Sequence, residues 1–219
     1  MQEVLNFLSE LKENNNKEWF DQNRERYQEC RKKMLFVTEF LISEIGKFDP
    51  EIGHLDPKNC LFRIFRDVRF SNDKTPYKTN MGTFIIKGGK NSAGAGYYLH
   101  IEPGASFVGG GSYCPPADAL KAYRTEIFDH PEEFKQIIYS ESFRKVYPEL
   151  YDDQLKTAPK GFPKDFADVD LLKYKSYAFG SSMDDALVTS DAFLTKVVDA
   201  LKELYPLNRF LNEALDKWL

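Results

Sequence analysis

The first 48 residues place hydrophobic positions at the three- and four-residue spacing of an α-helix. Val4, Phe7, Leu8 and Leu11 form one stripe, which the polar run 14–16 interrupts. An asparagine of this run is well placed to cap a second helix. The second stripe is longer and consists of Tyr27, Cys30, Met34, Val37, Leu41, Ile45 and Phe48. We therefore predict a short helix followed by a long amphipathic helix with one buried face.

Between residues 60 and 111 the pattern changes to short runs rich in β-branched and aromatic residues. Turns that contain Gly, Asn or Pro separate these runs. Because parallel strands need crossover connections of about a dozen residues or more, these short connections favour an antiparallel meander. The predicted strands are 60–70, 79–87, 96–102 and 105–110.

Helical spacing returns after Pro115-Pro116, where prolines are tolerated at a helix start. The predicted helices are 117–128, 131–147, 168–174, 190–205 and 207–218. No internal repeat, low-complexity tract or linker is visible in the pattern. We therefore predict one α+β domain over residues 1–219, with a mainly antiparallel sheet of about residues 60–111. This sheet packs against the long N-terminal helix and the C-terminal helices.

Composition agrees with a packed globular protein, because 42% of the 219 residues are hydrophobic and 15% are aromatic. The three cysteines, Cys30, Cys60 and Cys114, lie far apart and form no Cys-x-x-Cys motif. Reduced thiols in the cytoplasm are the simplest interpretation. The sequence shows no secretory signal at its start and no apolar run of about 18 residues. We therefore expect a cytoplasmic protein without a membrane-spanning segment.

One segment differs sharply in charge from the chain, whose net charge is −4. Residues 63–78 carry a local charge of +3, and like charges at close range repel unless a counter-charge or ligand is present. The cations of this segment are Arg63, Arg66, Arg69, Lys74 and Lys78, and its anions are Asp67 and Asp73. The segment is therefore the first candidate for a functional site.

Strand alternation would divide the first half of this segment between two faces. Arg63, Asp67 and Arg69 share one face, whereas Arg66 lies on an otherwise apolar face. A buried guanidinium needs a partner, since an unpaired buried charge is costly. We therefore expect Arg66 to be structural, and Asp67 to orient the arginines beside it.

The second half of the segment predicts a turn, because Asn, Asp and Pro cluster at residues 72–76. Arginine forks bind phosphate or carboxylate groups, and lysines add point charge. We therefore predict that a small anionic, phosphate-bearing ligand binds here. The ligand-binding candidates are Arg63, Asp67, Arg69, Asp73, Lys74, Tyr77 and Lys78, together with Lys160 from a later irregular segment. A purely structural salt-bridge network is the alternative interpretation.

The motif Arg63-x-x-Arg66-Asp67-x-Arg69-Phe70, followed by Asp73-Lys74-x-x-Tyr77, resembles the defining motif of a family of conserved hypothetical proteins. This family is catalogued as domain of unknown function 2461. Segments 15–20, 96–100, 107–111, 159–162 and 171–175 are also similar to it, so the resemblance spans nearly the whole chain. The resemblance implies a family of mostly bacterial proteins of this length, with related regions in longer fungal proteins. It implies no established activity.

A second candidate lies in the strand 97–102, where His100 and Glu102 share a face with Tyr98. Histidine titrates near neutrality, so His100 and Glu102 are the candidates for acid–base catalysis. If the protein is an enzyme, phosphoester hydrolysis or transfer is the first choice. A salt-bridged sheet face without catalytic function is the alternative.

Other chemistry has less support in the sequence. The three histidines form no His-x-x-x-His pair and the cysteines form no cluster, so we expect no metal and no cofactor. The run 109–111 is glycine-rich and precedes a helix, which suits either a phosphate cradle or close backbone approach. The negative net charge argues against broad nucleic-acid binding. A non-catalytic module that recognises a protein or nucleic acid is the competing class of function. The sequence does not indicate an oligomeric state.

Overall fold

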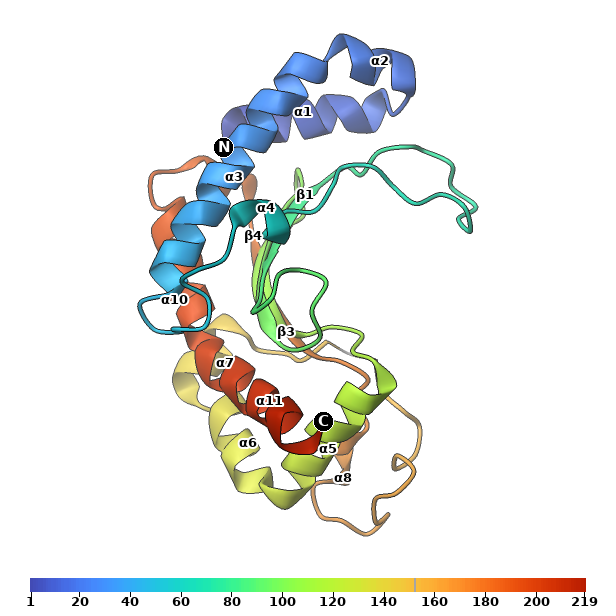
Figure 1. Cartoon of the computed structure of the whole chain (residues 1–219), viewed down its shortest axis with the longest axis vertical. Coiled ribbons are helices and arrows are strands. Elements are labelled where there is room, and N and C mark those ends of the chain that lie inside the picture. The colour runs from blue at the N-terminus through green and yellow to red at the C-terminus, as the bar shows by residue number, and fades with distance from the viewer. Residues whose placement is uncertain (152) are drawn as a thin grey trace. The chain divides into compact units, whose positions relative to one another are not determined.

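The chain has the predicted α+β fold with a four-stranded antiparallel sheet (Figure 1). The structure, a computed structural model, describes residues 1–151 and 153–219. Two compact units make up the fold. The first comprises Met1–Lys90, Tyr98–Val108 and Ser182–Asp199, and the second comprises Asn91–Tyr97, Gly109–Ser181 and Ala200–Leu219. The expectation of one domain over residues 1–219 stays a prediction.

The strands follow one another in the sheet in the order of the sequence. They are β1 (Met81–Ile85), β2 (Gly96–Ile101), β3 (Ser106–Ser112) and β4 (Tyr177–Met183). The pattern predicts the first three but not β4. In β4 the buried Tyr177, Phe179 and Met183 alternate with small or polar residues. This composition lacks the β-branched residues that mark strands, so the segment does not stand out in the sequence.

The two faces of β2 differ in burial. Tyr97, Leu99 and Ile101 are fully buried, whereas Tyr98, His100 and the following Glu102 are only partly buried. This alternation is typical of an antiparallel strand with one face on the core and one face toward solvent. On the core side, helix α3 packs against β1. The other face is free to carry a site.

The N-terminal helices of the first unit agree with the predicted pattern, with one extra break. The predicted long helix is divided at Asn23 into α2 and α3, and Asn16 caps α2 by accepting a hydrogen bond from the Trp19 N–H at 3.0 Å. Six of the seven predicted stripe positions are buried in α3, and Phe48 lies beyond its end. The helices are α1 (Gln2–Glu13), α2 (Lys17–Gln22), α3 (Arg24–Ile45), α4 (Pro57–Cys60) and α9 (Asp185–Thr189), with most of α10 (Phe193–Glu203).

The predicted strand at residues 60–70 is wrong. Residue 60 ends α4, and only two isolated bridges, Leu61 with Thr83 and Phe65 with Tyr77, pair the following segment with the chain that leads into β1. The bridged residues are four positions apart in the segment after α4 and six positions apart in the segment that leads into β1. Two extra residues between Lys78 and Gly82 therefore interrupt the ladder as a bulge. Beyond Phe65 the chain leaves the sheet as a loop.

The second unit is built mainly from helices that contact one another around α5 and α11. Its helices are α5 (Ala117–Asp129), α6 (Pro131–Ile138), α7 (Glu141–Val146), α8 (Val169–Leu172) and α11 (Tyr205–Trp218). The predicted helix 131–147 is two helices, because Ser140 leaves the helical conformation and caps α7 by accepting a hydrogen bond from the Phe143 N–H. Likewise, the predicted helix 190–205 begins only at Phe193, after the separate α9.

Within the described residues, none of the helices combines the length and the apolar character that crossing a membrane would require.

Candidate functional site

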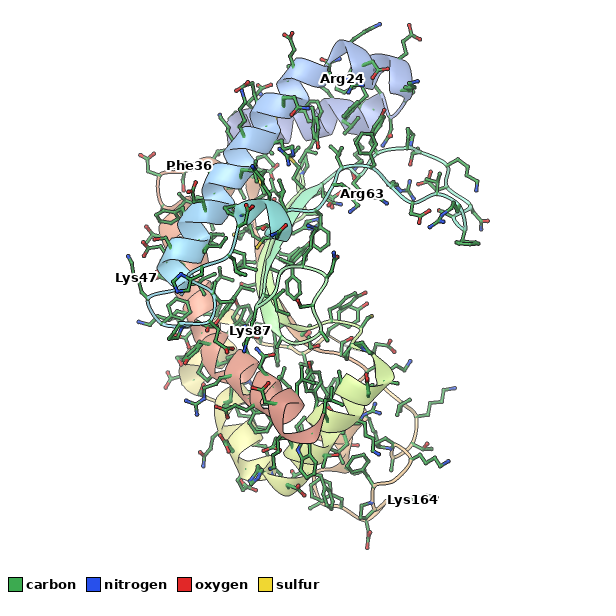
Figure 2. The ribbon with its side chains drawn as sticks, viewed as in Figure 1. Arg24, Phe36, Lys47, Arg63, Lys87 and Lys164 are labelled. Carbon is green, nitrogen blue, oxygen red and sulfur yellow. The ribbon has the colours of Figure 1, made fainter. Side chains whose placement is uncertain are left out.

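The cationic segment 63–78, called the arginine loop below, projects from the sheet between α4 and β1 (Figure 1). We call residues 63–65 and 77–78 its base and residues 67–75 its tip. Two backbone hydrogen bonds close the base, from the Arg66 N–H to the Pro76 carbonyl at 2.9 Å and from the Lys78 N–H to the Ile64 carbonyl at 2.8 Å. The loop is thus an irregular extension of the sheet. Figure 2 labels Arg63, at the point where the loop leaves the sheet.

Helix α2 and the preceding turn hold the base in place. The Asn15 amide accepts a hydrogen bond from the Tyr77 N–H at 3.0 Å and donates one to the Tyr77 carbonyl at 2.9 Å. The Tyr77 ring is buried and stacks on Phe20, with 4.0 Å between the ring centroids. Phe65 also contacts Phe20, at 5.9 Å. The base is therefore fixed by buried aromatic packing as well as by hydrogen bonds.

Arg66 binds groups of the loop itself. Its guanidinium contacts the Asp73 carboxylate, the Thr75 hydroxyl and, at 3.2 Å, the Thr75 carbonyl. Asp73 also accepts hydrogen bonds from the Thr75 N–H and hydroxyl at 2.9 Å. These contacts, first of all the Thr75 N–H and then Arg66, lower the pKa of Asp73 to about 2. Arg66 thus has an ion-pair partner on the loop and does not lie on the apolar strand face that the alternation predicts, and its structural role stays a prediction.

Two of the predicted ligand cations, Arg69 and Lys74, form hydrogen bonds within the tip. Arg69 grips Asp67 with two hydrogen bonds, Nε to Oδ1 at 2.9 Å and a terminal nitrogen to Oδ2 at 2.6 Å. This contact lowers the pKa of Asp67. Lys74 donates from Nζ to the Val68 carbonyl at 2.9 Å. The tip thus satisfies most of its own charge.

Arg63 and Lys78 differ from the other loop cations. In the described part of the chain neither side chain forms an ion pair or a hydrogen bond, whereas Lys74, which also lacks a carboxylate partner, donates to the Val68 carbonyl. Lys78 Nζ instead lies 5.3 Å from the centre of the Phe62 ring. Burial first, and then the positive charge of Arg63, lower the pKa of Lys78. The base therefore holds two neighbouring cations without a bound carboxylate.

A row of hydrogen-bonded side chains lies on the partly exposed face of β2. Tyr98 Oη is 3.0 Å from His100 Nδ1, and His100 Nε2 is 3.0 Å from Glu102 Oε2. The Thr79 hydroxyl donates to Glu102 Oε1 at 2.8 Å. We call Thr79, Tyr98, His100 and Glu102 the polar row. It brings the two predicted acid–base candidates together in direct contact.

Aromatic rings surround the polar row and connect it to the base of the loop. Phe107 stacks on His100, with ring centroids 4.7 Å apart, and Phe84 contacts Tyr98 at 6.4 Å. Phe62 contacts Tyr98 at 6.3 Å, and the same ring lies beneath the ammonium group of Lys78. Lys78 is also followed directly by Thr79 of the row. The cations and the polar row therefore adjoin on one side of the first unit.

A cavity of about 240 Å³ opens beside the base of the loop. Its lining residues are Asn15, Arg66, Asp73, Thr75, Tyr77, Lys78, Thr79 and Asn80. Lys78 and Thr79 thus face both this cavity and the neighbourhood of the polar row. The cavity provides room for a small anion next to Lys78.

Two predicted features belong to the second unit. Lys160 is an exposed residue of an irregular segment there. The run Gly109–Gly111 lies inside β3 and not in the turn before α5, where a phosphate cradle would need it. A Cβ at Gly109 or Gly111 would approach the backbone of β4 to about 2 Å. Close strand packing is therefore the physical reason for these glycines.

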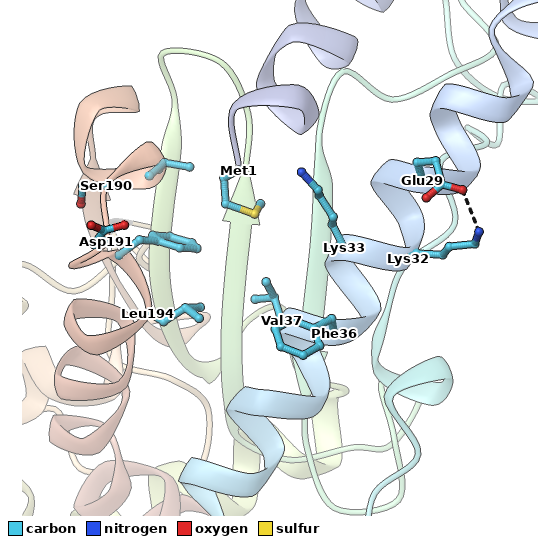
Figure 3. A pocket seen from close by; sticks show the side chains of 11 residues that line it. Met1, Glu29, Lys32, Lys33, Phe36, Val37, Ser190, Asp191 and Leu194 are labelled. Carbon is cyan, nitrogen blue, oxygen red and sulfur yellow. Dashed lines mark hydrogen bonds and ion pairs between the residues drawn. The ribbon is translucent and has the colours of Figure 1, made fainter.

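The first unit also has a larger cavity, of about 570 Å³ (Figure 3). None of the predicted site residues lines it. Its wall includes Lys33, Val37 and the exposed Phe36 from α3, and Leu194 from α10. Glu29 and Lys32 at its edge form an ion pair with each other. The cavity offers no acid–base pair comparable with the polar row.

Sequence reasoning missed three residues of the site. Tyr98 was visible as part of the same strand face as His100, and its hydroxyl extends the row by one group. Asn15 forms hydrogen bonds with Tyr77, and Thr79 forms one with Glu102. In both cases the partners are far apart in the sequence. Such contacts depend on the tertiary fold and leave no local signal. Among the described residues, no three His, Cys, Asp or Glu side chains are grouped as a metal site.

The comparison with protein families identifies the chain over nearly its full length. No curated protein and no solved structure matches it. A family model described as conserved hypothetical protein (DUF2461) matches residues 3–210, which include the arginine loop and the polar row. The chain therefore belongs to the DUF2461 family of conserved hypothetical proteins, the family that its sequence resembles.

Proposed function

We propose that the protein binds an anionic, phosphate-bearing ligand at the base of the arginine loop. The observation that carries this proposal is the pairing pattern of the loop cations. Arg66, Arg69 and Lys74 are bound within the loop, whereas Arg63 and Lys78 lie close enough to repel each other and hold no carboxylate. A phosphate group would relieve this repulsion, because it accepts hydrogen bonds from both side chains.

Phosphoester hydrolysis or transfer is the reaction that the neighbouring groups support best. His100 and Glu102 form a hydrogen-bonded acid–base pair, and Phe62 connects this row with Lys78. Cations that neutralise the phosphoryl oxygens and a nearby proton-transferring pair are the two requirements of such a reaction. The expected partner is thus a small phosphoester.

Binding of inorganic phosphate and ribose 5-phosphate, measured by calorimetry, tests the proposal. We expect Lys78→Gln to weaken binding about 10- to 100-fold, since a charge-assisted hydrogen bond contributes about 1.5–3 kcal/mol. Lys74→Gln is the matched control, because it removes the same charge from the same loop. We expect it to change the affinity less than about twofold. Equal losses in the two variants would contradict a site at the base and indicate a response to net charge alone.

The tip of the loop favours a second candidate function, a non-catalytic module that recognises a protein or nucleic acid. Phe70 is 95% exposed there, and the Arg69 guanidinium lies 5.8 Å from the centre of its ring. An exposed ring beside cations suits stacking on a base or a partner side chain. Binding to single-stranded oligonucleotides that falls steeply with added salt would support this function over the phosphate site.

A further inference from the structure

The directions of the hydrogen bonds in the polar row indicate which group the Tyr98 hydroxyl donates to. A carboxylate only accepts hydrogen bonds, so the Thr79 hydroxyl and His100 Nε2–H both donate to Glu102. In the state of His100 that can serve as a base, the imidazole is neutral with its proton on Nε2, and Nδ1 carries a lone pair. The Tyr98 hydroxyl therefore donates its single proton to Nδ1. Its oxygen keeps its lone pairs available to another group.

Tyr98 needs His100 to remove its proton, because the surroundings of the phenol keep it protonated. Burial first, and then the negative charge of Glu102, raise the pKa of the phenol to about 12. The phenol thus remains protonated near neutral pH unless His100 takes the proton. The pattern matches an activated nucleophile, in which a base contacts the attacking hydroxyl and a third group orients the base.

Gly82 of the neighbouring strand β1 leaves space for the Tyr98 hydroxyl. A Cβ added at Gly82 of β1 would lie 2.6 Å from Tyr98 Oη and 3.1 Å from the ring carbon that carries it. Any larger residue at this position would push the phenol away from its place over β1. Gly82 thus allows the Tyr98–His100 contact without taking part in the chemistry.

We propose that Tyr98 is the nucleophile of a phosphoester-cleaving site, with His100 as its base and Glu102 as the group that orients His100. This inference rests on the proposed phosphate site at Arg63 and Lys78. Tyr98 Oη forms a bond to phosphorus while the bond from phosphorus to the leaving oxygen breaks. The phenolic proton passes to His100 Nδ1 and then to the leaving oxygen. Water, deprotonated by His100, then hydrolyses the phosphotyrosyl intermediate and restores Tyr98.

Bis(4-nitrophenyl) phosphate is a suitable probe, because its aromatic groups suit the rings of Phe62, Phe84 and Phe107 around the row. With protein in excess, we expect rapid release of about one equivalent of 4-nitrophenolate per bound probe. Mass spectrometry of the quenched protein should show the remaining 4-nitrophenyl phosphoryl group on the peptide that contains Tyr98. An adduct on another residue, or turnover without an adduct, would overturn the assignment.

Two variants separate the chemistry from folding and from binding. Tyr98→Phe should abolish both the adduct and the rapid phase, while inorganic phosphate still binds. Gly82→Ala keeps the phenol and every charge but displaces Tyr98, so we expect the rapid phase to slow at least about tenfold. A wild-type protein that binds phosphate but releases no 4-nitrophenolate would overturn this inference and leave the proposed function intact. Failure of phosphate binding as well would contradict both.

Discussion

The tip and the base of the arginine loop contain the same kinds of cation in opposite situations. At the tip, Arg69 is bound to Asp67 and Lys74 to the Val68 carbonyl. At the base, Arg63 and Lys78 lie near each other without a bound carboxylate in the described structure. The tip therefore satisfies its cations with its own carboxylate and carbonyl oxygens, whereas the base leaves room for the charge of a ligand.

The two regions also differ in how firmly the fold holds them. Aromatic packing on Phe20 and two hydrogen bonds between the Asn15 amide and the Tyr77 backbone fix the base. The tip forms its contacts within the loop and exposes Phe70 almost completely. A binding site benefits from groups held by rigid neighbours, since less order must be created when the ligand binds. This difference supports the base over the tip as the place where an anion is gripped.

The largest effect that separates the two regions is expected from removing one phenylalanine ring in each. Phe20 is 1% exposed and contacts both Tyr77 and Phe65, so Phe20→Ala should lower the free energy of unfolding by about 3–5 kcal/mol. Phe70→Ala is the matched control at the tip and should change it by less than about 0.5 kcal/mol. Urea unfolding of the two variants measures the difference. Similar losses would show that the tip is packed as firmly as the base.

A smaller effect is expected from the hydrogen bonds that tie the base to the α1–α2 turn. Asn15→Ala removes both bonds to the Tyr77 backbone and should destabilise the protein by about 1–3 kcal/mol. Hydrogen exchange at the Tyr77 amide should speed up accordingly. Asn14→Ala is the control, because the Asn14 amide only donates to Glu10 within the end of α1. An unchanged Tyr77 amide in Asn15→Ala would mean that the ring stack alone fixes the base.

Local patterns of the sequence were sufficient for the fold class, for β1 to β3 and for most helices. They were insufficient where a tertiary contact decides the local structure. The segment after α4 has the composition of a strand, yet the change of register between Lys78 and Gly82 leaves it with two isolated bridges. Conversely, β4 pairs as a strand although Ala178, Gly180 and Ser181 give it little strand character.

The same limit applies to the candidate site. The charge excess of the loop and the shared face of His100 and Glu102 are visible in the sequence. The choice of partner is not, because Asp67 and Asp73 could each serve several cations within a few residues. Only the folded loop shows that Asp73 binds Arg66 and that Asp67 binds Arg69. The cations left without a carboxylate are Arg63, Lys74 and Lys78, and of these only Lys74 binds another group of the loop, the Val68 carbonyl.

The smallest effect is an acid titration confined to the tip. The Thr75 N–H, Arg66 and the Thr75 hydroxyl lower the pKa of Asp73 to about 2, below the value near 3.8 for a free aspartate. Because the folded-state pKa is the lower one, the stabilisation from ionised Asp73 is complete above about pH 3.8. It is lost as the pH falls through about 2. Nuclear magnetic resonance of the Thr75 amide, over the range in which the spectrum stays native, should therefore show a midpoint near pH 2.

Asp73→Asn should remove this transition and leave the Lys78 amide at the base unchanged. A Thr75 midpoint near pH 4 would instead show that Asp73 is free, and the tip would then resemble the base in lacking bound counter-charges.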